Sequence, residues 1–130
     1  MTTSELAAFK EKMKLRTKRF AHDCVKLSLK FPENFLAGHI SKQLIRCSTS
    51  VAANYRASCV AQTIPSVISK ISIAIEEADE SEFWIEFALD EKLITQQQAQ
   101  DLMKEAHELA STLIKSRQTL QQKKSNVKSF

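Results

Sequence analysis

Hydrophobic residues in the first quarter of the chain recur at the spacing of an α-helix. An apolar side chain appears every seven residues, which keeps one face of a helix apolar over about seven turns. The residues of this stripe and of the stripe beside it are Leu6, Met13, Phe20, Leu27, Phe9, Cys24 and Phe31. The pattern predicts a helix over residues 4–31. Pro32 would end it, because proline lacks a backbone N–H, and Asn34 is placed to cap the next helix.

A second apolar face follows and predicts a helix over residues 35–62. Its apolar positions are Ile40, Leu44, Cys47, Val51 and Tyr55. Small side chains make the middle of this helix narrow, which permits close approach of a neighbouring backbone; they are Ser48, Thr49, Ser50, Ala52 and Ala53. Thr63 is a suitable cap for a third helix, and Pro65 is tolerated in its first turn, where backbone N–H groups lack intrahelical partners.

The third helix, predicted over residues 64–90, carries the clearest stripe. Its members alternate steps of three and four residues and are interrupted only by one glutamate: Ile68, Ile71, Ile75, Ala78, Glu82, Ile85 and Leu89. A second apolar set, Ile73, Trp84 and Phe87, lies off this stripe. A helix that buries more than one face needs a neighbour beyond its own bundle. We therefore expect the protein to form a homo-oligomer.

A capping box marks the start of the fourth helix, predicted over residues 96–121. Thr95 and Gln98 have the spacing at which each side chain satisfies the other's backbone N–H. The apolar stripe that follows contains Leu102, Ala106, Leu109, Leu113 and Leu120, with Met103, Ala110 and Ile114 beside it. The tail, residues 122–130, has no stripe and is predicted to be frayed. Short connections favour antiparallel neighbours, so residues 1–130 are predicted to be one all-α, antiparallel up-down-up-down four-helix bundle.

Composition agrees with a helical domain and excludes several other classes of protein. One Gly and two Pro in 130 residues leave little material for the turns of an all-β fold. No apolar run approaches the roughly 20 residues that span a bilayer, so no membrane is expected. The first five residues lack the basic and apolar regions of a secretion signal. We therefore expect a cytoplasmic protein.

Charge is distributed unevenly along the chain. The net charges of residues 1–30, 31–64, 65–95 and 96–130 are +5, +2, −6 and +3. The basic ends suit an anionic partner, and the hypothesis is that they bind RNA or DNA through Lys10, Lys14, Arg16, Lys18, Arg19, Lys123 and Lys124. Lys10, Lys14 and Lys18 lie near one line of a helix and Arg16 and Arg19 on another, so a solvated face or salt bridges between subunits are open alternatives. No aromatic platform accompanies these residues, which predicts non-specific, salt-sensitive binding.

The third helix is rich in carboxylates, but no metal, cofactor or catalytic group is predicted. Di-iron bundles need Glu-x-x-His pairs on separate helices, and Glu80 is followed at that spacing by Phe83. The cysteines have no CxxC spacing and no basic activator, so they are interpreted as small buried hydrophobes. We therefore expect a non-enzymatic protein.

Three ordered blocks of sequence carry a resemblance to a known family. They are residues 16–21 (RTKRFA), 43–57 (QLIRCSTSVAANYRA) and 70–80 (KISIAIEEADE), the last followed by Trp84. Together they resemble the bacterial four-helix bundle proteins encoded in intervening sequences of 23S ribosomal RNA genes. The chain departs from the usual family pattern at Ala57, where Glu is common, and at Pro65-Ser66.

The resemblance implies a cytoplasmic antiparallel bundle that forms a ring-like homopentamer without known enzymatic activity. The architecture is also similar to that of the accessory protein of diversity-generating retroelements, which binds nucleic acid and a reverse transcriptase. Polar residues of the family-like blocks are predicted to make contacts between helices or subunits; they are Arg46, Asn54, Tyr55, Glu76, Glu80 and Trp84. A structural or adaptor bundle that binds another protein and no nucleic acid is the alternative function.

Overall fold

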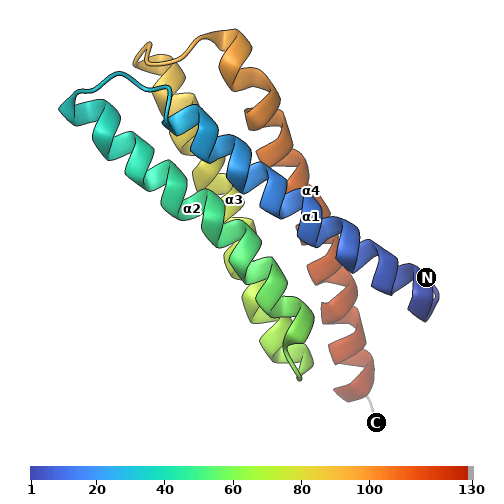
Figure 1. The fold of residues 1–130 in the computed structure, drawn as a ribbon. Helices are drawn as coiled ribbons and strands as arrows, with labels where there is room; N and C mark the ends of the chain where they lie inside the picture. The colour runs from blue at the N-terminus through green and yellow to red at the C-terminus, as the bar shows by residue number, and fades with distance from the viewer. Residues whose placement is uncertain (129–130) are drawn as a thin grey trace.

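Four antiparallel helices make up the protein (Figure 1). The computed structural model describes the backbone of residues 1–128 and the side chains of residues 1–126. The helices are α1 (Thr3–Ser28), α2 (Phe35–Val60), α3 (Ile64–Asp90) and α4 (Gln96–Lys128). No strand occurs in residues 1–128. The predicted all-α, up-down-up-down four-helix bundle is confirmed.

The starts of α2, α3 and α4 are fixed by the capping residues that the sequence indicates. Asn34 Oδ1 accepts a hydrogen bond from the Ala37 N–H at 2.8 Å, and Thr63 Oγ1 accepts one from the Ser66 N–H at 3.2 Å. At α4, Gln98 N–H donates to Thr95 Oγ1 at 3.2 Å and Thr95 N–H donates to Gln98 Oε1 at 2.9 Å. These bonds satisfy N–H groups that have no partner within the helix.

Replacing the α2 cap tests how much one such bond contributes. Asn34→Ala is expected to lower the free energy of unfolding by about 1 kcal/mol, because the Ala37 N–H loses its acceptor. Chemical denaturation followed by circular dichroism measures the change. Asn34→Asp keeps an acceptor oxygen and should stay near the unsubstituted protein; an equal loss in both variants would contradict the capping role.

Three predicted helix ends differ from the structure. α1 ends at Ser28 instead of residue 31, because Pro32 disfavours helical backbone in the residue before it. α2 ends at Val60 instead of residue 62. The prediction of a frayed tail is wrong for residues 122–128, which continue α4. This segment contains neither Gly nor Pro, and three of its seven residues are Lys, which favours helix without an apolar stripe. Residues 129 and 130 lie outside the described residues.

The core is formed by large side chains from every helix and small ones from α3. Fully buried large residues are Phe20, Ile40, Leu44, Ile85, Leu109 and Leu113. On α3 the buried residues are Ile71, Ala74, Ala78, Ser81, Ile85 and Ala88. The predicted stripe on α3 is thus rotated, because Ile75 and Leu89 lie at the edge of the core and are only partly buried. Small residues at the centre of this face allow α2 and α4 to pack closely against α3.

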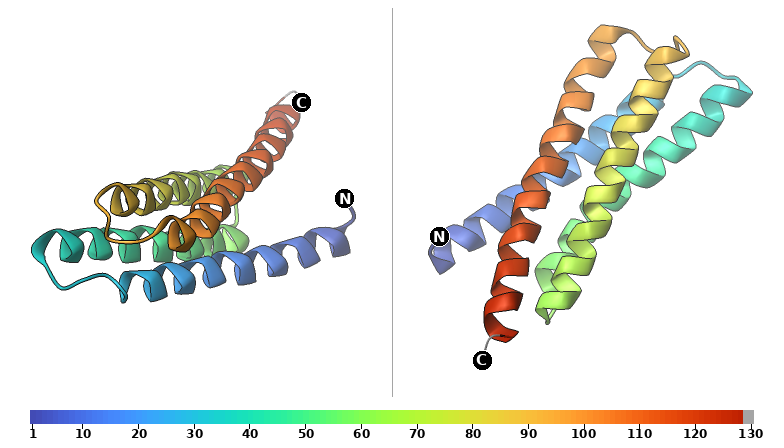
Figure 2. Two further views of the ribbon diagram at one scale, coloured as in Figure 1. Left: turned by 90° about the horizontal axis from the view of Figure 1, so that it is seen from above. Right: turned by 180° about the vertical axis from the view of Figure 1, so that it is seen from behind.

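α1 and α4 do not close the bundle along their whole length. α3 lies beside both α2 and α4, and α1 packs mainly on α2. α1 crosses α4 over a short stretch, and the first turns of α1 diverge from the last turns of α4 (Figure 2). α1 and α4 are therefore neighbours over only part of their length. Within residues 1–128, no helix has the length and apolar character needed to cross a membrane.

Candidate nucleic-acid interface

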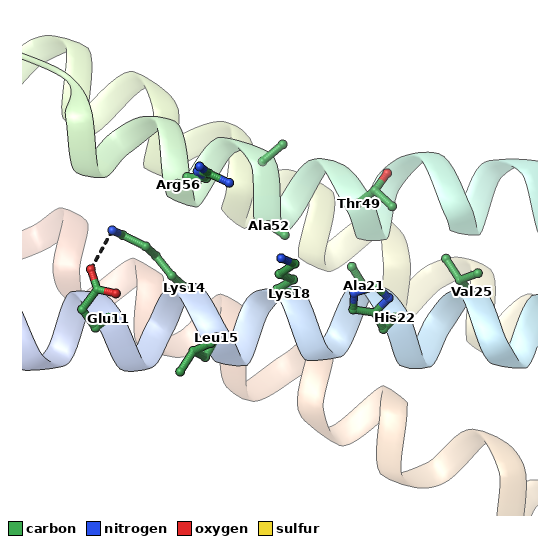
Figure 3. Close-up of a pocket in the computed structure, with 11 residues that line it drawn as sticks. Glu11, Lys14, Leu15, Lys18, Ala21, His22, Val25, Thr49, Ala52 and Arg56 are labelled. Carbon is green, nitrogen blue, oxygen red and sulfur yellow. Dashed lines mark hydrogen bonds and ion pairs between the residues drawn. The ribbon is translucent and has the colours of Figure 1, made fainter.

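An open groove of about 880 Å³ runs between α1 and α2 (Figure 3). Its lining comes from one stripe of each helix: Glu11, Lys14, Leu15, Lys18, Ala21, His22 and Val25 of α1, and Thr49, Ala52, Ala53 and Arg56 of α2. Steps of three and four residues keep each set on one side of its helix. The groove is therefore built by helical periodicity and by the packing of α1 on α2.

Small side chains of α2 shape the floor of the groove. Ser48 is buried toward the core, whereas Thr49 and Ala53 are exposed on the outer side of α2. On the core side of α2, the small side chain of Ser48 allows close packing of the neighbouring helices. On the outer side, the small side chains of Thr49 and Ala53 leave the space of the groove. Ala21 of α1, which is buried, completes an apolar floor.

Cationic groups outnumber carboxylates around this floor. Lys14 and Lys18 extend from α1 toward α2, and Arg56 lies on the α2 side (Figure 3). Glu11 is the one carboxylate of the lining; it accepts a hydrogen bond from Lys14 Nζ at 2.7 Å, which raises the pKa of Lys14. An exposed pair of this kind contributes little stability and opens readily. The groove therefore offers a cationic surface to a ligand.

The predicted basic residues are not all brought to the groove. Lys14 and Lys18 line it, whereas Lys10 and Arg19 lie on α1 outside the lining. Lys123 and Lys124 also lie outside it, in the last turns of α4, which lead away from the α1–α2 side (Figure 2).

Arg16 points to α4 and is held there by two carboxylates. Its Nε and Nη2 donate to Glu105 at 2.8 and 2.7 Å, and Nη2 also donates to Glu108 at 3.2 Å. The bond to Glu105 raises the pKa of the Arg16 guanidinium. Bidentate geometry of this kind is the strong form of an ion pair. The structure therefore gives Arg16 an interhelix contact and makes it unavailable to a ligand in this state.

A double-mutant cycle measures the link between α1 and α4. Arg16→Ala and Glu105→Ala are each expected to destabilise the protein, with a coupling energy of about 1 kcal/mol, because the pair is bidentate but partly exposed. Denaturation of both single variants and the double variant gives the coupling. Raising the salt concentration should reduce it, and a coupling near zero at low salt would show that the pair is structurally neutral.

Sequence reasoning missed two basic residues that line the groove, Arg56 and His22. His22 could have been found, because it follows Lys14 and Lys18 at steps of four residues. Arg56 stands alone on the second helix, and no pattern in the sequence says that it faces α1. Only the packing of the two helices places it across from Lys14 and Lys18.

Two of the predicted polar residues join α2 to α3 on the other side of α2. Arg46 Nη1 donates to Glu77 at 2.9 Å, and Arg46 Nη2 donates to Glu80. Behind this pair, Ser81 Oγ lies 3.2 Å from Cys47 Sγ in the core. These contacts hold the acidic helix α3 against α2.

The remaining predicted polar residues make no polar contact between helices in the described structure. Asn54 Nδ2 donates within α2 to the Ser50 carbonyl and hydroxyl oxygens at 3.0 and 2.9 Å. Tyr55 is buried, which raises the pKa of its phenol, and Glu76 is exposed. Within the described residues the buried Trp84 Nε1–H has no acceptor, and Trp84 contacts α2 through its ring. Contacts of these residues to another subunit stay a prediction.

Neither a metal-binding cluster nor an activated thiol is found in the described part of the chain. No group of three or more His, Cys, Asp or Glu side chains in it is arranged to hold a metal ion. Cys24 and Cys47 lie in the core, and burial raises the pKa of both thiols. A protonated buried thiol is a poor nucleophile. The α1–α2 groove is therefore the strongest candidate for a functional site.

Comparison with known proteins places the chain in a family. Residues 10–115 match the family described as 23S rRNA-intervening sequence protein. A solved structure from Bacteroides thetaiotaomicron, described as a protein with unknown function from the S23 ribosomal protein family, is 30% identical and has a TM-score of 0.73; the match covers 81% of this chain and 97% of that one. No curated protein matches the chain. Neither description names an enzymatic activity. The chain belongs to the 23S rRNA-intervening sequence protein family.

Proposed function

We propose that this protein is a non-enzymatic, homo-oligomeric bundle that binds the phosphate backbone of RNA or DNA in the α1–α2 groove. The observation that carries the proposal is the convergence of Lys14, Lys18 and Arg56 from two helices onto one open groove with a single carboxylate. Each phosphate neutralised by such a side chain releases counterions, which favours association without reading sequence.

The proposed contact follows a line along the two helices. Lys14, Lys18 and His22 follow one another on α1 at steps of four residues, a rise of about 6 Å per step. Arg56 faces this line from α2. Arg16 is excluded from the contact because it is bound to Glu105 and Glu108. A single strand lying along the groove meets Lys14, Lys18 and Arg56 without bending around the bundle.

A salt titration with labelled oligonucleotides tests the proposal. Single-stranded RNA, single-stranded DNA and duplex DNA are titrated with the protein, and fluorescence anisotropy is measured at several salt concentrations. Three phosphate contacts predict a slope of log affinity against log salt of about −2 for a single strand. No Phe, Tyr or Trp side chain lines the groove, so affinity should vary little with base sequence. Absence of binding at low salt would refute the proposal.

The same samples test the non-enzymatic part of the proposal. The oligonucleotides are expected to be recovered at full length after long incubation with the protein, as seen on a denaturing gel. Supporting this expectation, the groove lining contains no pair of carboxylates and no cysteine. Time-dependent cleavage that follows the protein through purification would contradict it.

The homo-oligomeric part of the proposal rests on exposed apolar residues. Val60 of α2 and Ile73 of α3 are exposed large hydrophobic residues, and Ile73 belongs to the second apolar set that led us to expect self-association. Light scattering should give a multiple of the 14.7 kDa chain mass, and the homopentamer implied by the resemblance would scatter as five chains. A monomer at micromolar concentration would refute the homo-oligomer. It would not contradict nucleic-acid binding in the groove.

We place the protein in the cytoplasm. The three cysteines, Cys24, Cys47 and Cys59, are all free thiols, and unpaired cysteines suit a reducing compartment. An adaptor function, in which the bundle binds another protein, is the second candidate. It is favoured by exposed aromatic residues on α2 and α3, outside the groove.

A further inference from the structure

α2 begins and α3 ends at the same end of the bundle (Figure 1). An aromatic cluster joins the two helices near that end. The Trp84 ring meets Phe83 at 5.0 Å and Phe87 at 5.8 Å between ring centroids, both in edge-to-face geometry. His39 of α2 packs on the Trp84 ring in the same way at 5.6 Å. These contacts fix the rings relative to one another.

Two phenylalanines leave large apolar areas on this side in contact with solvent. Phe83 is 51% exposed although it contacts both Trp84 and Phe87. Phe35, which precedes His39 by one helical turn, is 95% exposed. We call Phe35, His39, Phe83, Trp84 and Phe87 the aromatic surface. The rings of Phe83, Trp84 and Phe87 are contiguous. Contiguous exposed apolar area on a small protein marks an interaction site, and fixed aromatic rings are the usual anchors of protein interfaces.

Carboxylates surround the exposed ring of Phe83. Asp79 and Glu80 precede Phe83 by four and three residues, and Glu86 and Asp90 follow it by three and seven, so all four share its side of α3. Arg46, the cation across from them on α2, is already bound to Glu77 and Glu80, while Lys42 follows His39 by three residues. Acidic groups therefore dominate the rim of the aromatic surface.

We propose that the aromatic surface is a docking site for a basic segment of a partner protein. An arginine or lysine side chain of that segment lies over the ring of Phe83 in a cation–π contact. Neighbouring cations of the segment meet the carboxylates of Asp79, Glu86 and Asp90. The charge of the rim repels a polyanion, so this site and the nucleic-acid groove take ligands of opposite sign.

The basic helix of a second copy is a less suitable occupant than a separate protein. Three of the α1 cations are committed elsewhere, since Lys14 and Lys18 line the α1–α2 groove and Arg16 is bound to α4. Docking the Lys14–Lys18 side of α1 of one copy onto the aromatic surface of another would cover the groove. The two sites share no residue, so the docking proposal stands whether or not the groove binds nucleic acid.

Trp84 is the one tryptophan of the chain, so its fluorescence reports directly on this surface. The full chain is titrated with a synthetic amphipathic peptide that carries arginine and leucine at helical spacing. A saturable change in emission is expected, weakened by added salt. The same peptide with citrulline in place of arginine keeps the shape and removes the charge, and it should bind at least tenfold more weakly.

Variants of exposed residues locate the binding. Phe83→Ala is expected to weaken the arginine peptide about tenfold, in line with loss of an aromatic anchor, and Glu86→Gln/Asp90→Asn should weaken it severalfold. Leu15→Ala removes a similarly exposed apolar side chain from the α1–α2 groove, outside the aromatic surface, and is the matched control that should leave peptide binding unchanged. Circular dichroism confirms folding of each variant, which is expected because all the replaced side chains are exposed.

Several outcomes would overturn the docking proposal. One is an absence of saturable change with the arginine peptide, and another is equal binding of the citrulline peptide. If the peptide does not bind and Phe83→Ala instead lowers the mass in light scattering, the surface is an interface between copies of this chain. Oligonucleotide binding by Phe83→Ala should equal that of the unsubstituted protein, so failure of this proposal is distinguishable from failure of the groove proposal.

Discussion

Reversing two charges of the groove, in Lys18→Glu/Arg56→Glu, is expected to weaken binding of single-stranded RNA about a hundredfold at low salt. Each reversal removes an attraction to phosphate and adds a repulsion. A close pair at the surface contributes on the order of 1 kcal/mol, so two lost attractions sum to about 2 kcal/mol. The two added repulsions bring the expected loss to about 2.8 kcal/mol, which is a factor of about 100. Fluorescence anisotropy measures the loss, and the salt dependence should become shallower because fewer counterions are released.

A second double variant, Lys123→Glu/Lys124→Glu, is the matched control for that experiment. It changes the net charge of the protein by the same amount but lies in the last turns of α4, outside the groove lining. Its affinity should fall only severalfold through the general field of the protein. Equal losses in the two variants would show that total charge, and not the groove, governs binding. Lys18 and Arg56 are exposed, so folding should be unaffected.

Truncating the main anchor of α1, in Phe20→Ala, is expected to lower the free energy of unfolding by about 3–5 kcal/mol. The Phe20 ring is fully buried, and its removal loses apolar burial and leaves a cavity. Total stability of a domain of this size is about 5–15 kcal/mol. α1 touches α4 over only a short stretch, so the attachment of α1 to the bundle depends largely on such buried residues. If α1 detaches, the α1–α2 groove should be lost as well. Urea denaturation gives the size of the change.

Leu15→Ala is the control for the core experiment, since Leu15 is on the same helix but 71% exposed. It should change stability by less than about 0.5 kcal/mol. A small effect of Phe20→Ala, comparable to that of Leu15→Ala, would mean that α1 is attached mainly by polar contacts such as Arg16 with Glu105.

The starts of the helices were predictable because their signals are local. Asn34, Thr63 and the Thr95–Gln98 box act through hydrogen bonds that span three residues, and no distant partner is needed. The end of α4 was mispredicted for the opposite reason. An apolar stripe reports burial against other helices, whereas residues 122–128 stay helical through their intrinsic preference for helix.

Only the α1 side of the groove could be predicted from the sequence. Lys14 and Lys18 were assigned to a basic surface because their spacing puts them on one side of a helix. Arg16 was assigned to the same surface, but the structure pairs it with Glu105, which lies 89 residues away in the chain. Arg56 was missed because its role depends on which side of α2 meets α1. The partners of both arginines are set by helix packing, and spacing within one helix carries no information about that.

The sequence by itself determined that the chain is helical, where three of the helices begin and which side of α1, α2 and α4 is apolar, because capping bonds and helical periodicity are properties of short segments. The tertiary structure decided how the helices meet. It rotates α3 so that Ala74, Ala78 and Ser81 lie at the centre of the core, and it lets α1 diverge from α4. It also divides the charges of α1 between a groove and an ion pair. These outcomes depend on side-chain shape across interfaces between residues far apart in sequence, where close packing of a few small and large groups selects one arrangement among several that share the same apolar pattern.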